Sequence, residues 1–208
     1  MPLAARRASG ARQAAWLGPL GLGLLLVALA ALAWGGDEWR LALRYDRAAL
    51  ADGQWWRAFT AHAVHLGWAH AALNMAGIAL CAVLAPALFA RPARLAALLA
   101  AEALGISAGL WLLSPQVGNY AGFSGVLYGL FVAGLWPQRR DPGMAAALLV
   151  VVGWMAWQWL GGPLDTEVRM IGGHIVAIAH IYGAVIGALW LALAAGRRRL
   201  ARWVLSAG

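Results

Sequence analysis

The residues with the clearest chemical potential are a serine and a histidine in otherwise apolar parts of the chain. Ser124 occurs in Gly122-Phe123-Ser124-Gly125, and His180 opens His180-Ile181-Tyr182-Gly183. A serine hydroxyl is a weak nucleophile at neutral pH and requires a base within hydrogen-bond distance, a role that an imidazole can fill. We therefore predict that Ser124 and His180 form a catalytic dyad. The competing interpretation is a serine that bonds to a carbonyl one turn back and a histidine that is satisfied in the core.

Small residues beside these two side chains favour a close approach of their segments. Gly125 and Gly129 are four residues apart, and so are Gly183 and Gly187, which gives each segment a small-xxx-small face. Such faces let helix backbones pack closely in membranes. Gly122 gives the backbone freedom to turn at the entrance of its helix. We predict that the two helices pack with the serine and the histidine within reach of each other.

Three further polar side chains could assist the same chemistry. His70 and Asn74 are four residues apart, so they share one face of a helix, and both can donate hydrogen bonds. Donors directed at a developing oxyanion often supply the largest catalytic contribution. Tyr128 follows Ser124 by one helical turn and could stack on the imidazole. Taken alone, the first pair is also typical of a hydrogen bond between helices, and the tyrosine of simple packing.

The elements that carry these residues are long apolar segments. Of the 208 residues, 63% are apolar and 12% are charged, against about 45–50% and about 25% in soluble domains. This composition excludes an ordinary soluble globule and predicts an all-α polytopic membrane protein with a single domain over residues 1–208. Residues 35–67 form an amphipathic loop that we expect to lie in the membrane interface. Six spans are predicted, at residues 16–34, 68–89, 92–113, 120–136, 143–160 and 174–195.

The distribution of arginine predicts how the chain is oriented. All 16 basic residues are arginines, and eleven of them precede the first span, follow the second or fourth, or form the tail. The positive-inside rule then places both termini in the cytoplasm, so the arginines do not indicate nucleic-acid binding. Spans two, four and six enter from the outer face, which gives four polar side chains one depth near that face: His70, Asn74, Ser124 and His180. No aspartate or glutamate is expected at that depth, which predicts a dyad rather than a triad.

Together these residues resemble the rhomboid family of intramembrane serine proteases. The likeness covers five of the six segments in order, and it includes Trp56-Arg57 and His65 of the long loop. It implies a six-helix bundle in which Ser124 is the nucleophile and His180 the general base. The substrates would be membrane-anchored proteins cut near the outer face, with no cofactor and no metal. The resemblance also implies that His70 and Asn74 line an oxyanion hole and that the ring of Tyr128 stacks on His180.

A narrower resemblance points to the rhombosortase branch of this family. It is carried by three segments, Gly53–Thr60, Phe123–Gly129 and Ala179–Ala184. The branch implies a location in the bacterial inner membrane with the active site toward the periplasm. It also implies substrates that are exported proteins with C-terminal Gly-Gly sorting tails. One departure is Tyr128, at a position where many members of the branch carry a histidine.

Several alternatives stay open from the sequence. A general rhomboid protease would cut other single-span substrates, and a rhomboid-like pseudoenzyme would bind membrane segments without cutting them. A haem protein is disfavoured because His62, His65 and His70 are spread over the loop and the start of a helix, and His174 and His180 are not one turn apart. A transport protein is disfavoured because no inverted repeat is visible. Glu102 has no assigned role, and Gln158 is expected in an outer aromatic belt with neighbouring tryptophans. Hydrolysis and transfer to an amine are both compatible with the residues.

Overall fold

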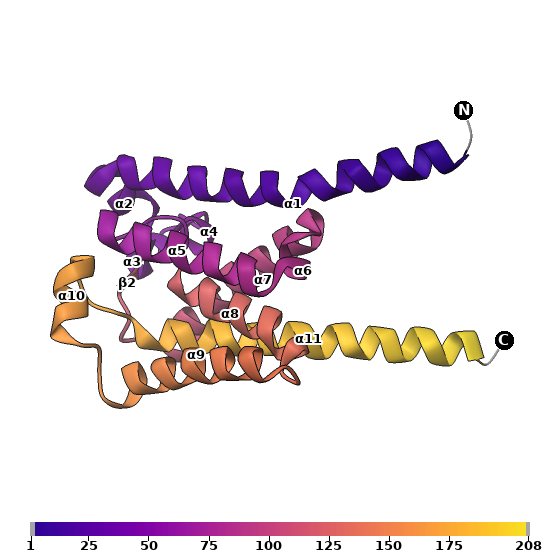
Figure 1. The fold of residues 1–208 in the computed structure, drawn as a ribbon. Coiled ribbons are helices and arrows are strands. Elements are labelled where there is room, and N and C mark those ends of the chain that lie inside the picture. The colour runs from indigo at the N-terminus through magenta and orange to yellow at the C-terminus, as the bar shows by residue number, and fades with distance from the viewer. Residues whose placement is uncertain (1–2, 207–208) are drawn as a thin grey trace.

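We describe the protein from a computed structural model, which defines the backbone of residues 3–206 and the side chains of residues 18–202 except 198 and 200. The fold is mostly helical, with one two-stranded sheet in the described part of the chain (Figure 1). In chain order the elements are α1 (Leu3–Trp34), α2 (Gly36–Leu43), β1 (Tyr45–Asp46), α3 (Arg47–Ala51), α4 (Arg57–Thr60), α5 (Trp68–Leu84), α6 (Pro86–Phe89), α7 (Pro92–Leu113), β2 (Asn119–Tyr120), α8 (Ser124–Leu135), the 3-10 helix η1 (Trp136–Gln138), α9 (Pro142–Leu160), α10 (Asp165–Ile171) and α11 (Ala177–Ser206).

The prediction of a helical membrane protein is confirmed in its coarse form. Within the described residues, α7, α9 and α11 are each long and apolar enough to cross a membrane, and α1 with α2 forms a fourth candidate that bends by 108°. Helix α5 has 17 residues and α8 has 12, fewer than the roughly 20 of a full span. The count of six spans and the orientation with both termini in the cytoplasm therefore stay predictions.

Four of the predicted segments differ from the helices at their boundaries. The helix of the segment 16–34 already begins at Leu3. The segment 68–89 is broken at Ala85, because Pro86 starts the separate helix α6 and the residue before a proline avoids helical geometry. The segment 120–136 becomes helical only at Ser124, after strand β2 and a turn at Gly122. The segment 174–195 starts its helix at Ala177 and continues to Ser206.

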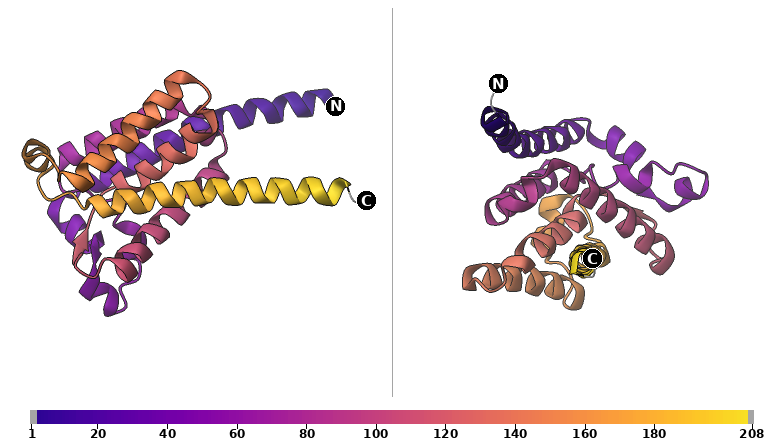
Figure 2. Two further views of the ribbon diagram at one scale, coloured as in Figure 1. Left: turned by 90° about the horizontal axis from the view of Figure 1, so that it is seen from below. Right: turned by 90° about the vertical axis from the view of Figure 1, so that its right-hand side faces the viewer.

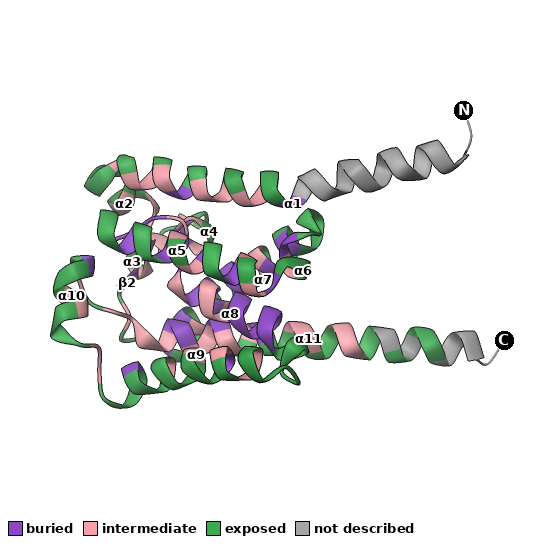
Figure 3. Ribbon diagram, viewed as in Figure 1, coloured by how far each residue is buried: buried purple, intermediate pink, exposed green. Residues whose placement is uncertain are grey.

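The helices form a bundle with α8 in its interior. Helix α1 lies at one edge and α9 at the opposite edge (Figure 2), and α8 packs against α5, α7, α9 and α11. Most of α8 is buried, whereas α9 exposes most of its surface (Figure 3). The first turns of α1 and the last turns of α11 lie at the same end of the bundle, and α2, α10 and the short sheet lie at the other (Figure 1).

Helices α8 and α11 approach each other through their glycine faces. A Cβ atom on Gly183 would overlap the carbonyl oxygen of Gly125, and one on Gly187 would overlap that of Gly129. A Cβ on Gly125 would lie 3.0 Å from the carbonyl oxygen of Ala179. Backbone atoms cannot rotate away as a side chain can, so only glycine fits at these contacts without moving a helix.

Glu102 of α7 lies beside the same contact. Its side chain is 0% exposed, and a Cβ on Gly129 would overlap its carboxyl group. Neither carboxyl oxygen has a hydrogen-bond partner among the described residues. Because glycine has no side chain, position 129 leaves space in the centre of the bundle for the carboxyl group of Glu102.

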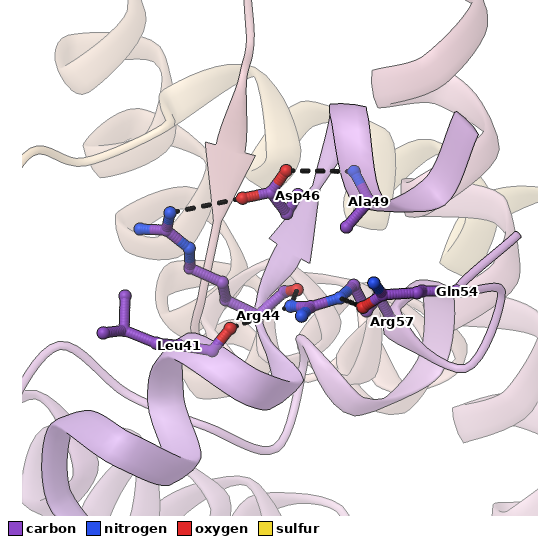
Figure 4. A network of polar contacts seen from close by, with 6 residues as sticks. All are labelled: Leu41, Arg44, Asp46, Ala49, Gln54 and Arg57. Carbon is purple, nitrogen blue, oxygen red and sulfur yellow. Dashed lines mark hydrogen bonds and ion pairs between the residues drawn. The ribbon is translucent and has the colours of Figure 1, made fainter. Parts of the chain in front are cut away.

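The segment between α1 and α5 is held together by the guanidinium group of Arg57 (Figure 4). Its Nη1 donates to the carbonyl oxygens of Leu41 and Arg44, each at 2.9 Å, and its Nε donates to Oε1 of Gln54 at 2.8 Å. Arg57 is buried, and these acceptors satisfy a charged group that would be costly to bury alone. The sequence predicts one loop here, whereas the structure has short helices packed around Arg57.

The same segment is tied to the residues that precede α8. Strands β1 and β2 are antiparallel, with Tyr45 paired with Tyr120. Asp46 accepts from the backbone N–H of Ala49 at 3.2 Å, and this bond and an ion pair with Arg44 keep the pKa of its carboxyl group below its usual value. The long loop thereby fixes the turn that leads to Ser124.

The contact between α8 and α11 predicts an unequal response to two glycine substitutions in one helix. Gly187→Ala should lower the free energy of unfolding by about 1–3 kcal/mol, because overpacking moves backbones apart. Gly196→Ala is the matched control, since Gly196 has nothing within 4 Å of the position that its Cβ would take. The measurement is the melting temperature of both variants in detergent micelles. Equal melting temperatures would contradict the close contact.

Candidate active site

Ser124 is presented by a turn that requires glycine. It is the first residue of α8, and Gly122 before it has φ +136°, a conformation that other residues rarely adopt. A Cβ on Gly122 would lie 2.6 Å from the ring of His70. The Gly122 N–H donates to the carbonyl oxygen of Ala61 at 3.0 Å, and its own carbonyl oxygen accepts from the Tyr120 hydroxyl at 2.6 Å. These bonds fix the backbone immediately before the serine.

The structure brings Ser124 and His180 within hydrogen-bond distance. Ser124 Oγ lies 2.9 Å from His180 Nε2. Ser124 is half-buried and His180 is buried in the first turn of α11. A base at this distance can take the hydroxyl proton as the oxygen attacks, so the arrangement suits nucleophilic catalysis.

Residues of α8 and α9 contact the rest of the imidazole ring. The ring of Tyr128 stacks on His180, with centroids 4.5 Å apart and an interplanar angle of 29°. Gln158 Oε1 lies 2.9 Å from His180 Nδ1 and accepts from the Tyr128 hydroxyl at 3.4 Å. The amide Nε2 of Gln158 donates to Glu167 Oε1 of α10 at 2.8 Å.

The expectation for Gln158 is wrong. Its side chain is buried, whereas Trp154, Trp157 and Trp159 around it are exposed, so it points into the bundle rather than joining an aromatic belt. The cost of an amide in lipid singles Gln158 out within its apolar segment and agrees with this inward position. Glu167 was missed because it lies in a short helix between α9 and α11 and is linked to His180 only through Gln158.

His70 and Asn74 lie one turn apart on α5, and both are buried. Asn74 Nδ2 donates to the carbonyl oxygen of His70 at 3.0 Å, which uses one of its two N–H groups. The His70 Nδ1 accepts from the backbone N–H of Leu66 at 3.4 Å. His65 packs edge-on against the His70 ring, and its Nε2 accepts from the Phe123 N–H at 3.4 Å. Burial, with a smaller effect of His70, lowers the pKa of His65 to about 3, so this ring is a neutral acceptor.

A cavity of about 730 Å³ joins these side chains. Ser124 and His180 line it together with residues of α5, α9 and α10. A space of this size accommodates several residues of an extended peptide, and its walls are mostly apolar. The polar residues of the wall are His70, Asn74, Asn119, Tyr120, Ser124, Tyr128, Gln158, Glu167, His174 and His180.

The described part of the chain offers no cluster of three or more histidine, cysteine or acidic side chains that could hold a metal ion.

Comparison with known proteins places this site within a recognised domain. A family model described as the Rhomboid domain matches residues 52–197. A search of curated proteins gives no match. The matched range includes Ser124, His180, His70 and Asn74, and it covers well over half of the chain. The protein is therefore an integral membrane protein that belongs to the rhomboid family, a family of intramembrane serine proteases.

Proposed function

We propose that the protein is an intramembrane serine endopeptidase with Ser124 as its nucleophile and His180 as its general base. The observation that carries the proposal is the 2.9 Å approach of Ser124 Oγ to His180 Nε2, in the wall of a peptide-sized cavity inside a rhomboid domain. A pseudoenzyme is disfavoured, because the two side chains it would have lost are present and in contact.

The proposed reaction starts with attack of Ser124 Oγ on the scissile carbonyl carbon while His180 Nε2 takes the hydroxyl proton. The carbonyl oxygen becomes an oxyanion, and His180 then gives the proton to the leaving amine as the C–N bond breaks. An acyl-enzyme remains on Ser124. Water attacks it, gives a proton to His180, and releases the carboxylic acid as the serine recovers its proton. An amine in place of water would give transfer instead of hydrolysis.

Donors for the oxyanion lie at the same cavity wall. Asn74 keeps one N–H free of the His70 carbonyl, and both side chains line the cavity with Ser124. The Ser124 backbone N–H is at the start of α8, where helix amides have no internal partner and favour negative charge. We assign His70, Asn74 and this amide to a shared oxyanion hole.

The proposed substrate is a membrane-anchored exported protein that enters the cavity from the bilayer. A membrane helix hides its carbonyl groups in its own hydrogen bonds, so it must unwind before attack, and glycine lowers that cost. A C-terminal Gly-Gly sorting tail would meet this requirement, as the rhombosortase resemblance implies. In this proposal the chain is one six-span domain in the bacterial inner membrane, with both termini in the cytoplasm and the cavity toward the periplasmic face.

Loss of either member of the proposed dyad should abolish cleavage. Ser124→Ala and His180→Ala are each expected to reduce cleavage of a tagged Gly-Gly-tail substrate in membranes to background, a loss of at least about 10³-fold. The matched control is Ser114→Ala, because Ser114 bonds to the Tyr182 hydroxyl away from the cavity. Cleavage by either dyad variant at the rate of the Ser114→Ala protein would contradict the proposal.

Removal of one oxyanion donor should have a smaller effect on the chemical step. Asn74→Ala is expected to lower kcat severalfold with little change in KM. This loss is smaller than the roughly 10²–10³-fold decrease in kcat that follows removal of a single dominant oxyanion donor. The reason is that His70 and the Ser124 amide continue to donate. The measurement is steady-state cleavage, with the melting temperature as a check on folding. An unchanged kcat would remove Asn74 from the oxyanion hole.

The substrate branch is tested with a matched pair of tails. A substrate with the Gly-Gly tail should be cleaved faster, by about tenfold or more, than the same substrate with Val-Val at that position, because β-branched residues lack the backbone freedom of glycine. Cleavage is measured by release of the tagged domain from vesicles. Equal rates would favour a general rhomboid protease over a rhombosortase.

A further inference from the structure

The series of hydrogen bonds at the site continues beyond the proposed general base, His180, to two further side chains. His180 Nδ1 lies 2.9 Å from Gln158 Oε1, and Gln158 Nε2 donates to Glu167 Oε1 at 2.8 Å. The chain of contacts thus runs from Ser124 on α8 through α11 and α9 to α10. Gln158 is 3% exposed, and a buried amide without hydrogen-bond partners is destabilising. The two contacts therefore govern how this amide is oriented.

The direction of these hydrogen bonds follows from the types of atoms. A carboxylate only accepts, so the end of the Gln158 amide that faces Glu167 must be the NH₂ group. The amide oxygen then faces His180, and an oxygen only accepts, so His180 Nδ1 must carry the proton. A neutral imidazole with its proton on Nδ1 has a lone pair on Nε2, and Nε2 is the atom that faces Ser124 Oγ.

We infer that Gln158 is a positioning residue for the base His180 and that Glu167 orients Gln158, an inference that rests on the proposed function. The pair selects the histidine tautomer that can take the proton from Ser124. The site thereby has a third member, an amide in place of the carboxylate that serves this role in the better-known serine hydrolases. Gln158 and Glu167 do not touch the reacting atoms.

No proton moves beyond His180 in this arrangement. The Ser124 proton goes to Nε2 and later leaves with the amine, while the Nδ1 proton stays on the ring and is shared with the Gln158 oxygen. When both ring nitrogens are protonated, the amide oxygen and the nearby Glu167 carboxylate face the positive charge. Tyr128 stacks on the same ring and donates to the same amide oxygen, which has two lone pairs for these two donors.

The competing interpretation is that Gln158 only ties α9 to α10 and α11. A tether of this kind would affect the melting temperature and the access of substrate, and so KM. It would not decide which nitrogen of His180 carries a proton, nor the intrinsic reactivity of Ser124 toward a small reagent. These two properties separate positioning from tethering.

The kinetic test uses the full chain in lipid vesicles and a fluorophosphonate probe, which reacts with an activated serine without needing a peptide substrate. Gln158→Leu is expected to lower the labelling rate of Ser124 and kcat about 10- to 100-fold with KM changed less than about threefold. The expected range is that of losing a group that orients a metal-binding histidine, which is the nearest analogue. The matched control is Gln138→Leu, since Gln138 bonds to the Leu84 and Gly134 carbonyls at the far end of α8. Equal labelling by the two variants would overturn the inference.

A rescue experiment uses an exchange of the two side chains. In Gln158→Glu with Glu167→Gln, the amide at position 167 can donate to the carboxylate at 158, which still accepts from His180 Nδ1. We expect this double variant to label within about fivefold of the wild-type protein, and Gln158→Glu alone to be slower because two carboxylates then face each other. A double variant as slow as Gln158→Leu would contradict the inferred directions of the bonds.

The tautomer is measured directly by nitrogen NMR on protein carrying ¹⁵N-histidine, with the His180→Ala variant used to assign the signal. The inference requires His180 protonated on Nδ1 in the wild-type protein and shifted toward Nε2 protonation in Gln158→Leu. The same tautomer in both proteins would overturn it. The NMR measurement does not depend on proteolysis, so it tests the role of Gln158 even if the probe does not label the wild-type protein. Failure of the probe to label the wild-type protein would instead count against the proposed function.

Discussion

Where Gly125 and Gly129 of α8 face Gly183 and Gly187 of α11, two helix backbones approach so closely that a single added methyl group would overlap a carbonyl oxygen. The position of Ser124 relative to His180 depends on this contact, because each side chain lies within a turn of it on its own helix. In a bilayer, lipid tails are as apolar as leucine, so close packing and hydrogen bonds between helices supply most of the association. The glycines thus connect the stability of the bundle with the geometry of the site.

The polar side chains around that contact are organised so that most have partners in a mostly apolar bundle. Ser124, His180, Gln158 and Glu167 form one series of contacts. Arg57 bonds to Leu41 and Arg44 and so holds the loop whose strand β1 pairs with β2, just before Ser124. Burial strengthens each of these interactions and raises the cost of losing a partner. Their orientation is consequently well determined, which is a requirement for general base catalysis.

Glu102 differs from this pattern. Its carboxyl group is fully buried beside Gly129 and has no partner among the described residues. It fills the space that the glycine leaves.

The sequence predicts the helical membrane architecture, and it singles out His70, Asn74, Ser124 and His180 because polar side chains are rare in apolar segments and stand out there. It is less informative where tertiary contacts decide. Pro86 and the turn at Gly122 shift helix boundaries that hydropathy alone cannot place. The tryptophans around Gln158 favour an outer aromatic belt, whereas its side chain is buried in the bundle. Glu167 has no local signal in the sequence because its partner lies on another helix.

The roles of Ser124 and His180 are tested by identifying the residue that a fluorophosphonate modifies in the full chain reconstituted in lipid vesicles, using peptide mass spectrometry. We expect a single adduct on Ser124 that disappears in the His180→Ala protein. An unmodified protein, an adduct on another serine, or labelling of Ser124 that is unaffected by loss of His180 would show that the two residues are not a nucleophile and its base.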